Sequence, residues 1–386
     1  MKKISTFDLY PGMILGEDVL NYDRQVILSS GTALTDTLIS RIELNGVLEV
    51  YIKEVDNEAS ATEDAPKGNS AETTVNSPAS AQPQQSEDTE DQVNKHASYA
   101  DRIKSSPDFQ KFKEDYDQIT SGFKFKLNEM VDKNVEIDTK VLLQEPLQLI
   151  SSSGSSSNTL DMLHNMRDYD DLTFAHSMNV ALLNYVAAGW LNWSEADKEL
   201  AMACGLLHDI GKLQVSHDIL TKPGKLDNVE YKHIQQHPIF GYQLLKDRVD
   251  VHIMNSALMH HERYDGTGYP LKIKGTAIDR FARLTAISDV YDAMTAARCY
   301  RGPLCPFRVI EIFEDEGFDK YDVEYILSFL SNVGNTYVRN SCRLSDGREG
   351  EIIMLNKEKL SRPVVQCGYE YIDLSKHSDL RIEIIL

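Results

Sequence analysis

Residues 56–98 contain no Leu, Ile, Met, Phe, Tyr or Trp, and this absence divides the chain into separate folding units. The stretch consists mainly of Ala, Ser, Thr, Asn, Gln, Pro and acidic residues, and its nine acids against two lysines give a net charge of −7. Such a segment buries too little apolar surface to offset the entropy lost on ordering. We therefore predict a disordered acidic linker over residues 56–98.

The segment before the linker has the pattern of a small α/β module. Residues 1–55 hold two β-prone runs, Val26–Leu28 and Val47–Ile52, with glycines at the expected turns. A short amphipathic helix is expected over Thr35–Leu44. Residues 1–55 are therefore predicted to be a compact N-terminal α/β module.

The segment after the linker changes its pattern once. Apolar residues recur at helical spacing over residues 99–335, where 151–158 is predicted to be a Ser/Gly loop. Residues 336–386 return to β-prone stretches around Gly347. The predicted fold is mainly α, with a helical domain over 99–335, including its leading helices, and a small β appendage over 336–386.

Charge and cysteine usage restrict the partners and the compartment. A formal net charge of −20 argues against a nucleic-acid polymer, which requires a basic surface. None of the five cysteines forms a CxxC pair, and the first residues have no signal-peptide pattern. These features are typical of reduced thiols in a cytoplasmic protein.

The apolar stretch Leu172–Leu191 has about the length of a membrane span. It is interrupted by His176, Asn179 and Asn184, which would be costly in lipid and are common in a buried helix that carries a functional group. We predict a core helix here, and we expect no association with a membrane.

Seven histidine and aspartate side chains occur in short motifs between residues 176 and 289. They are His176, His208, Asp209, His237, His260, His261 and Asp289. Neutral imidazole and carboxylate groups bind divalent first-row metals. Seven groups exceed what one tetrahedral ion needs and fit two ions that share a site. A lone histidine is more often a core or surface residue, but the joint pattern favours a two-metal centre for phosphoester cleavage.

Two of the motifs place adjacent ligands at the end of a helix. His208 and Asp209 follow the apolar helical run Ala201–Leu207, so we expect them at its inner end. Consecutive helical residues point about 100° apart, so the two side chains can reach different ions, or Asp209 can bridge both. His260 and His261 repeat this arrangement.

These motifs resemble the HD-GYP subgroup of the HD phosphohydrolase superfamily. The likeness covers residues 165–305 in detail and about 130–335 as a domain, and Gly268-Tyr269-Pro270 within HHERYDGTGYP matches the diagnostic signature of the subgroup. The resemblance implies an HD-domain helical bundle that hydrolyses the bacterial second messenger cyclic di-GMP at an iron, manganese or mixed two-metal site. It also implies that the seven residues above are the metal ligands and that Asp209 bridges the ions.

One departure from the family pattern concerns the number of metals. A subset of the family has a glutamate one helical turn before the first histidine, which supports a third ion. Leu172 occupies that position here, and leucine cannot ligate a metal. We therefore expect two divalent ions, Fe or Mn.

Basic residues near the motifs are candidates for substrate binding. Lys212 would share a face with His208 in a continuing helix, and we expect it to act as the catalytic cation at the scissile phosphate. Arg298 and Arg301 match positions where the family uses basic residues for cyclic di-GMP, and guanidinium groups bind phosphate bidentately. A role as ordinary surface charges is the alternative for all three.

The glycine-rich loop has two interpretations. Gly268, Tyr269 and Pro270 are expected to shape a lip over the site. The family resemblance adds substrate binding and docking of a diguanylate cyclase through this loop. Asp265 either orients His261 or a water as a second-shell group, or caps its own loop.

The leading functional prediction is hydrolysis of cyclic di-GMP to pGpG, GMP or both, by a hydroxide that bridges the two metals. No serine or cysteine nucleophile motif such as GxSxG is present, in agreement with this chemistry. The alternatives are hydrolysis of another cyclic dinucleotide and a non-catalytic cyclic di-GMP receptor. Homodimer formation, metal identity, end product and base specificity are left open by the residue types.

Overall fold

The structure is a computed structural model that describes most of the chain. The described residues are 1–5, 9–20, 26–35, 38–39, 41–42, 47, 49–53, 103–133, 137–166, 172–220, 222, 227–296 and 304–386. The predicted linker over 56–98 and the candidate substrate residues Arg298 and Arg301 lie outside these ranges.

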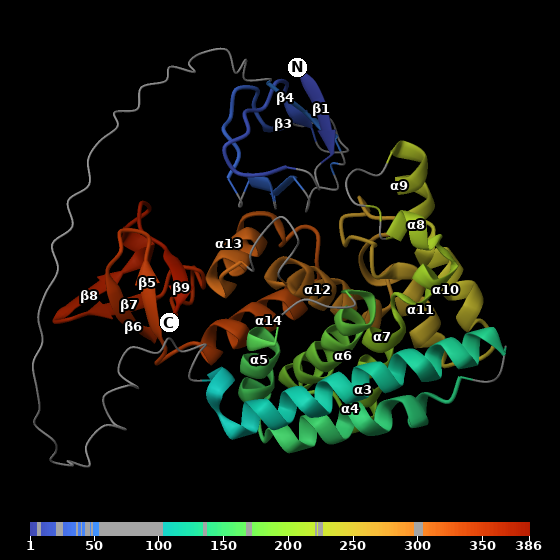
Figure 1. Ribbon diagram of the computed structural model, residues 1–386. Helices are drawn as coiled ribbons and strands as arrows, with labels where there is room; N and C mark the ends of the chain where they lie inside the picture. Colours follow the sequence, from blue (N-terminus) through green and yellow to red (C-terminus); the bar gives the residue numbers. More distant parts are fainter. Residues whose placement is uncertain are drawn as a thin grey trace, which may run out of the picture.

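Helices dominate the chain after residue 103 (Figure 1). The α-helices are α3 (Pro107–Asp132), α4 (Thr139–Ser153), α5 (Ser156–Asn165), α6 (Leu172–Trp190), α7 (Glu195–Leu207), α8 (His217–Leu220), α9 (Asn228–Ile234), α10 (His237–Leu245), α11 (Val251–Met259), α12 (Arg280–Thr295), α13 (Pro306–Glu316) and α14 (Val323–Thr336). The short 3₁₀ helices are η3 (Ile210–Gln214), η4 (Gly275–Ala277) and η5 (Leu374–Lys376).

Helix α6 lies inside the bundle and packs against α7 and α12. Its residues from Met178 to Ala188 are mostly buried. The side-chain NH₂ group of the buried Asn184 donates hydrogen bonds to the Ala201 carbonyl (3.0 Å) and the Thr285 hydroxyl (2.9 Å), so both of its donor hydrogens are paired inside the core. Among the described residues, no helix has the length and apolar character needed to cross a membrane. The core helix predicted from the apolar stretch is thus present.

Helix α4 extends further than the sequence pattern predicted. The expected loop over 151–158 is reduced to a break at Gly154 and Ser155 between α4 and α5. The hydroxyl groups of Ser151, Ser152 and Ser153 donate to carbonyls three or four residues earlier, which lets these serines continue the helix. The Ser155 side chain then caps α5 by accepting from the Asn158 amide.

The N-terminal module has its own hydrophobic core. Strand β1 (Lys2–Ser5) pairs antiparallel with β4 (Glu49–Ile52), and β2 (Val19–Leu20) pairs antiparallel with β3 (Val26–Leu28). The buried apolar residues of this module form a cluster separate from the main core. In Figure 1 the module is drawn in blue, next to the N-terminus.

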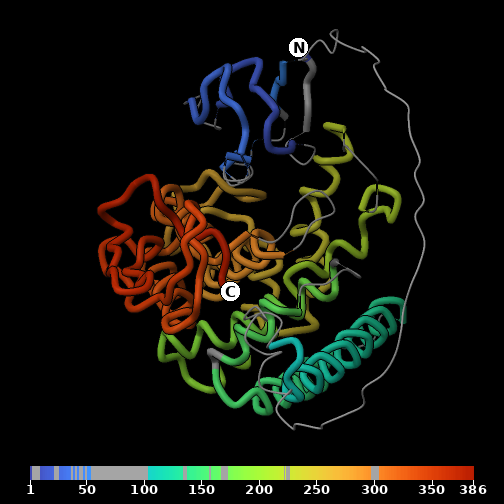
Figure 2. The backbone as a smooth tube through the Cα atoms, turned by 60° about the vertical axis from the view of Figure 1, so that its left-hand side comes forward, coloured from blue at the N-terminus to red at the C-terminus, as the bar shows by residue number. Residues whose placement is uncertain are grey.

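The C-terminal residues form one antiparallel sheet. Its strands are β5 (Ser341–Leu344), β6 (Glu349–Met354), β7 (Val364–Cys367), β8 (Glu370–Asp373) and β9 (Ile382–Ile385), in the spatial order β8-β7-β6-β5-β9. Helix α13 contacts β9, and buried sheet residues such as Leu344 and Ile352 belong to the same core cluster as the helices. Figure 2 shows this sheet, in red, beside the helical region. The mainly helical fold with a C-terminal β-sheet agrees with the prediction.

Candidate metal centre

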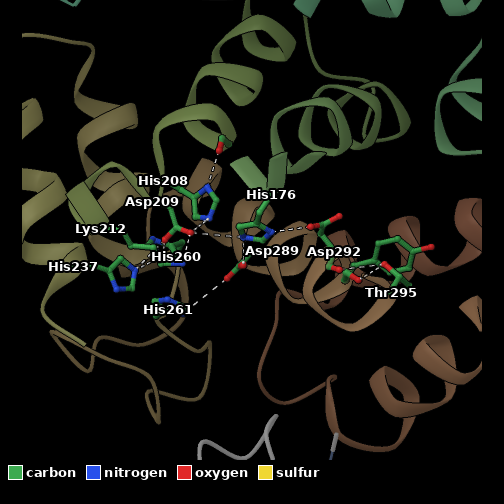
Figure 3. A network of polar contacts seen from close by, with 12 residues as sticks. His176, His208, Asp209, Lys212, His237, His260, His261, Asp289, Asp292 and Thr295 are labelled. Atoms are coloured by element: carbon green, nitrogen blue, oxygen red, sulfur yellow. Dashed lines mark hydrogen bonds and ion pairs between the residues drawn. The ribbon is translucent and has the colours of Figure 1, made fainter. Parts of the chain in front are cut away.

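The seven predicted ligands converge on one region of the helical bundle (Figure 3). They come from five places in the chain: His176 from α6, His208 and Asp209 from the end of α7, His237 from the start of α10, His260 and His261 from the end of α11, and Asp289 from α12. The inner members, among them His208, His260 and Asp209, are almost completely buried. Residues far apart in the sequence therefore meet in a shared polar cluster within an apolar core.

Three of the histidines are oriented by free carbonyl groups at helix ends. The last carbonyls of a helix lack an intrahelical partner. The ring Nδ1 atoms face such carbonyls: His208 faces Gly205 (2.7 Å), His237 faces Ile234 (2.7 Å), and His260 faces Ala257 (3.0 Å). His260 Nδ1 also lies 3.1 Å from the Ser256 carbonyl, which accepts from the His260 amide as well. A carbonyl only accepts, so each Nδ1 carries the proton and each Nε2 presents a lone pair to the cluster.

Several nitrogen and oxygen atoms in the cluster are hydrogen-bond acceptors that face no donor. The Nε2 atoms of His237 and His260 lie 3.2 Å apart, and the tautomers set by their Nδ1 partners make both of them acceptors. His208 Nε2 and Asp209 Oδ1 are buried and have no hydrogen-bond partner. Acceptors that face one another in a buried site repel unless a cation lies between them. The donor set therefore fits divalent metal ions.

Asp209 lies at the middle of the cluster, and its two oxygens face different histidines. Its Oδ2 atom is 3.8 Å from His176 Nε2 and 3.4 Å from His208 Nε2. Its Oδ1 atom is 3.2 Å from His237 Nε2 and 3.8 Å from His260 Nε2. One carboxylate thus connects two groups of imidazoles.

Three sets of ligand atoms are close enough for each set to hold one ion. Within each set, the atoms lie within 4.8 Å of one another: His176, His208 and Asp289; His237, His260 and His261; and His208, Asp209 and His260. We call the first set, which contains His176, position 1 and the second set, which contains His237, position 2. The third set joins them through Asp209.

Asp292 belongs to this network, although the sequence analysis did not identify it. Its Oδ2 atom lies 2.8 Å from His176 Nδ1, while Asp289 Oδ1 lies 3.0 Å from His176 Nε2. Both carboxylates project from α12, three residues apart, so they share a face of that helix. The i,i+3 spacing was the only signal in the sequence. The contact with a histidine 116 positions earlier depends on the packing of α6 against α12.

The electrostatics keep the carboxylates ionised. Burial raises the pKa of Asp209, but Lys212 and the nearby histidines lower it well below its ordinary value. Burial likewise raises the pKa of Asp289, but its hydrogen bond to His176 lowers it well below the usual range. For His260 and His261, burial and the neighbouring imidazoles lower the pKa well below the usual value. Ionised carboxylates and neutral imidazoles are the forms that bind metals.

Lys212 lies beside the cluster, but a continuation of helix α7 does not place it there. Helix α7 ends at Leu207, and the chain turns into η3. Lys212 Nζ then lies 2.5 Å from Asp209 Oδ2, with its side chain 25% exposed. Within this turn the backbone approaches α10 closely: a Cβ at Gly211 would lie 1.9 Å from the His237 carbonyl oxygen. The expected shared face with His208 was therefore wrong.

The loop after His261 is folded against the cluster. The buried Glu262 carboxylate accepts hydrogen bonds from the amides of Leu271 (2.5 Å) and Lys272 (3.1 Å). Gly268 is buried so tightly that a Cβ would lie 2.5 Å from the His261 carbonyl oxygen. Tyr269 follows and stacks on the His261 ring, and its bond to Pro270 is cis.

Asp265 makes its contacts within its own loop. It accepts hydrogen bonds from the backbone amide (2.9 Å) and the hydroxyl (2.7 Å) of Thr267. This geometry matches the loop-capping alternative. Among the described residues, no hydrogen bond joins Asp265 to His261.

Comparison with known proteins finds similar sequences for part of this region. Residues 160–325 match the family model described as HD domain. A cyclic di-GMP phosphodiesterase from Pseudomonas aeruginosa is 34% identical over 215 residues, which are 55% of this chain and 51% of that protein. A 3′3′-cGAMP-specific phosphodiesterase from Vibrio cholerae is 41% identical over 153 residues, which are 37% of this chain and 34% of that protein. A cyclic di-GMP phosphodiesterase from Thermotoga maritima is 32% identical over 188 residues, which are 47% of this chain and 51% of that protein. The chain thus spans about half or less of the length of these relatives.

Proposed function

We propose that this chain, whose residues 160–325 match the HD domain family model, is a metal-dependent phosphodiesterase that hydrolyses cyclic di-GMP. The observation that carries the proposal is the position of Asp209, whose two carboxylate oxygens face different groups of histidines. This arrangement supports a carboxylate shared by two ions. The names of the Pseudomonas and Thermotoga relatives support cyclic di-GMP as the substrate.

The residues for two ions are present in the chain. We assign one ion to position 1 (His176, His208 and Asp289) and the other to position 2 (His237, His260 and His261), with Asp209 between them. Two such ions, when bound, acidify water and neutralise the oxygens of a phosphodiester. Fe and Mn both suit a site of imidazoles and carboxylates, so we propose either metal.

The substrate would approach the more open side of the cluster. His176, His261 and Asp289 are 16%, 21% and 11% exposed in their side chains, whereas Asp209 is 2% exposed. Lys212 lies beside Asp209 and is also partly exposed. Its ammonium group would bind an oxygen of the scissile phosphate and hold the diester against the ligands, because it is a cation in direct contact with the Asp209 carboxylate. No protein nucleophile is required in this scheme.

A turnover assay with metal quantification tests the proposal. The full chain, purified without oxygen, is expected to hold about two Fe or Mn ions and to convert cyclic di-GMP to pGpG, GMP or both. His208→Ala should abolish turnover. His252→Ala is the matched control, because His252 pairs with Asp279 (2.7 Å) outside the cluster, and it should retain activity. A metal-loaded protein that forms no linear product from any cyclic dinucleotide would contradict the enzyme and favour a receptor.

A second candidate substrate is 3′3′-cGAMP. The observation that favours it is the Vibrio cholerae relative, which is named as specific for this dinucleotide. The metal ligands act on the phosphodiester and not on the base, so their geometry agrees with either substrate. Rates measured side by side on cyclic di-GMP, 3′3′-cGAMP and cyclic di-AMP separate the candidates. A higher kcat/KM for 3′3′-cGAMP would replace cyclic di-GMP as the proposed substrate.

A further inference from the structure

His176 differs from the other cluster histidines in the partner of its Nδ1 atom. His208, His237 and His260 are oriented by carbonyls at helix ends. His176 lies inside α6, where the backbone carbonyls are engaged in the helix, so a free carbonyl is not offered by its own segment. Asp292, a carboxylate that is only 2% exposed, lies 2.8 Å from its Nδ1 atom instead.

Two carboxylates from one helix hold the His176 ring at both nitrogens. Asp289 faces Nε2 at 3.0 Å, and Asp292 faces Nδ1 at 2.8 Å (Figure 3). In the metal-binding tautomer, Nδ1–H donates to Asp292, and the Nε2 lone pair is left for an ion. A carboxylate behind a ligating imidazole fixes the orientation of the ring and increases its basicity more than a neutral carbonyl does.

We propose that Asp292 is a positioning residue for His176 and makes position 1 the more tightly binding of the two metal positions. Position 1 contains the Asp289 carboxylate and an imidazole supported by Asp292. Position 2 consists of three imidazoles, and among them His237 and His260 are oriented by carbonyl groups. The ion at position 2 therefore leaves first when metal is removed.

Asp292→Asn is the direct test, because asparagine has nearly the same shape, can still accept a hydrogen bond and lacks the charge. Metal-free protein is titrated with Mn²⁺ in competition with a chelator, and the ions per chain are counted at each free concentration. The wild type should show two dissociation constants. In Asp292→Asn the tighter constant should weaken about 10- to 100-fold, which is the usual effect of losing a group that orients a ligand.

Asp279→Asn is the matched control. Asp279 also faces a histidine Nδ1 (His252, 2.7 Å), and it caps α12 by accepting from the Phe281 amide (2.9 Å). Asparagine is also a good helix cap, so α12 should be preserved. This variant should bind both ions as the wild type does. Unchanged constants in Asp292→Asn, or an equal loss of both ions, would overturn the proposal.

Single-position variants test the order of affinities without changing Asp292. His261→Ala impairs position 2 and should keep one ion with the tighter constant of the wild type. His176→Ala impairs position 1 and should keep only a weakly bound ion. The double variant His176→Ala/Asp292→Asn should bind Mn²⁺ as His176→Ala does, because Asp292 acts through His176. A further loss in the double variant would show a general structural role instead.

The inference rests on the metal centre of the proposed function but not on its substrate. Two bound ions without turnover would reject the proposed phosphodiesterase, and the Mn²⁺ constants would still decide the role of Asp292. A wild-type chain that binds neither Mn²⁺ nor Fe²⁺ would overturn both. A protein that turns over cyclic di-GMP but has equal constants at the two positions would overturn this inference alone.

Discussion

Tyr269 stacks on the His261 ring, with 4.7 Å between the ring centroids and 20° between the planes. The Tyr269 amide also donates to the His261 carbonyl at 3.2 Å. The Glu262 carboxylate joins the two ends of the loop by accepting hydrogen bonds from the Leu271 and Lys272 amides. The loop that contains Gly268-Tyr269-Pro270 therefore covers a candidate metal ligand, in addition to any contact it makes with substrate or a diguanylate cyclase.

This stacking predicts a difference between two substitutions of Tyr269. An aromatic pair contributes about 0.5–1.5 kcal/mol beyond its buried area. Tyr269→Phe keeps the ring and should retain most turnover and both ions. Tyr269→Leu removes the ring and should lower kcat by about two- to tenfold, with weaker metal binding at position 2. Equal, large losses in both variants would show that the phenol hydroxyl acts on the substrate, and would contradict a role through stacking.

The central position of Asp209 predicts a combined loss of metal and activity. Asp209→Ala removes the carboxylate that faces both groups of histidines, so turnover should become undetectable and the metal content should fall below that of the wild type. Metal analysis and a turnover assay on the same sample measure both effects. An unchanged count of two ions would show that Asp209 does not connect the two positions.

Substitution of Lys212 is predicted to lower activity without loss of metal. Its ammonium group lies at the open side of the cluster and is no metal ligand, so Lys212→Ala should keep both ions and lower kcat by about 10²-fold. Lys198→Ala is the matched control, because Lys198 pairs with Glu195 at the start of α7, at the other end of the helix. Loss of metal from Lys212→Ala would instead assign this lysine a structural role.

The pKa of His176 predicts how the stability of the metal-free protein depends on pH. Burial lowers this pKa, but hydrogen bonds to Asp289 and Asp292 raise it from 6.5 to about 9. Because the folded-state pKa is above the unfolded value, the stabilisation is complete below about pH 6.5 and is lost as the pH rises to about 9. The free energy of unfolding in urea should fall by at most about 3 kcal/mol over this interval.

Two controls accompany the pH experiment. His176→Gln cannot be protonated, so its metal-free form should lack this loss of stability between pH 6.5 and 9. The Mn²⁺-loaded wild type should lack it as well, since a ligating imidazole is already neutral. The same slope in His176→Gln and in the wild type would assign the effect to another group.

Short motifs and the family resemblance together predicted that the seven candidate ligands lie at one site, and the structure brings these side chains together. His208 and Asp209 are adjacent, as are His260 and His261, so local spacing carries the information. The role of Asp292 could not be predicted, because it depends on which face of α12 meets α6. A pattern within one helix gives the face that two residues share but not the helix that this face contacts.

The end of α7 shows the same limit on a smaller scale. The apolar run before His208 predicts a helix, but nothing in that run predicts that it stops at Leu207. Beyond this end, Gly211 approaches His237 and Gly241 on α10, a tertiary contact that the local sequence pattern does not indicate. At residues 151–153 the helix continues where the sequence pattern predicted a loop. The serine hydroxyls there donate to backbone carbonyls three or four residues earlier, within α4.

The close approach of Gly211 to helix α10 predicts that even a small side chain at this position destabilises the fold. A Cβ there would lie 1.9 Å from the His237 carbonyl oxygen and 2.5 Å from the Gly241 nitrogen, and backbone atoms cannot move aside cheaply. Gly211→Ala should therefore destabilise the fold by about 3 kcal/mol and displace His237, with loss of metal at position 2. Gly122→Ala is the control: in α3 the nearest atom to the new Cβ is Glu145 Oε2 at 3.8 Å, so better helix propensity should stabilise by about 0.5–1 kcal/mol. Urea unfolding and metal analysis of both variants test this prediction, because equal stability of Gly211→Ala and the wild type would contradict a close backbone contact between η3 and α10.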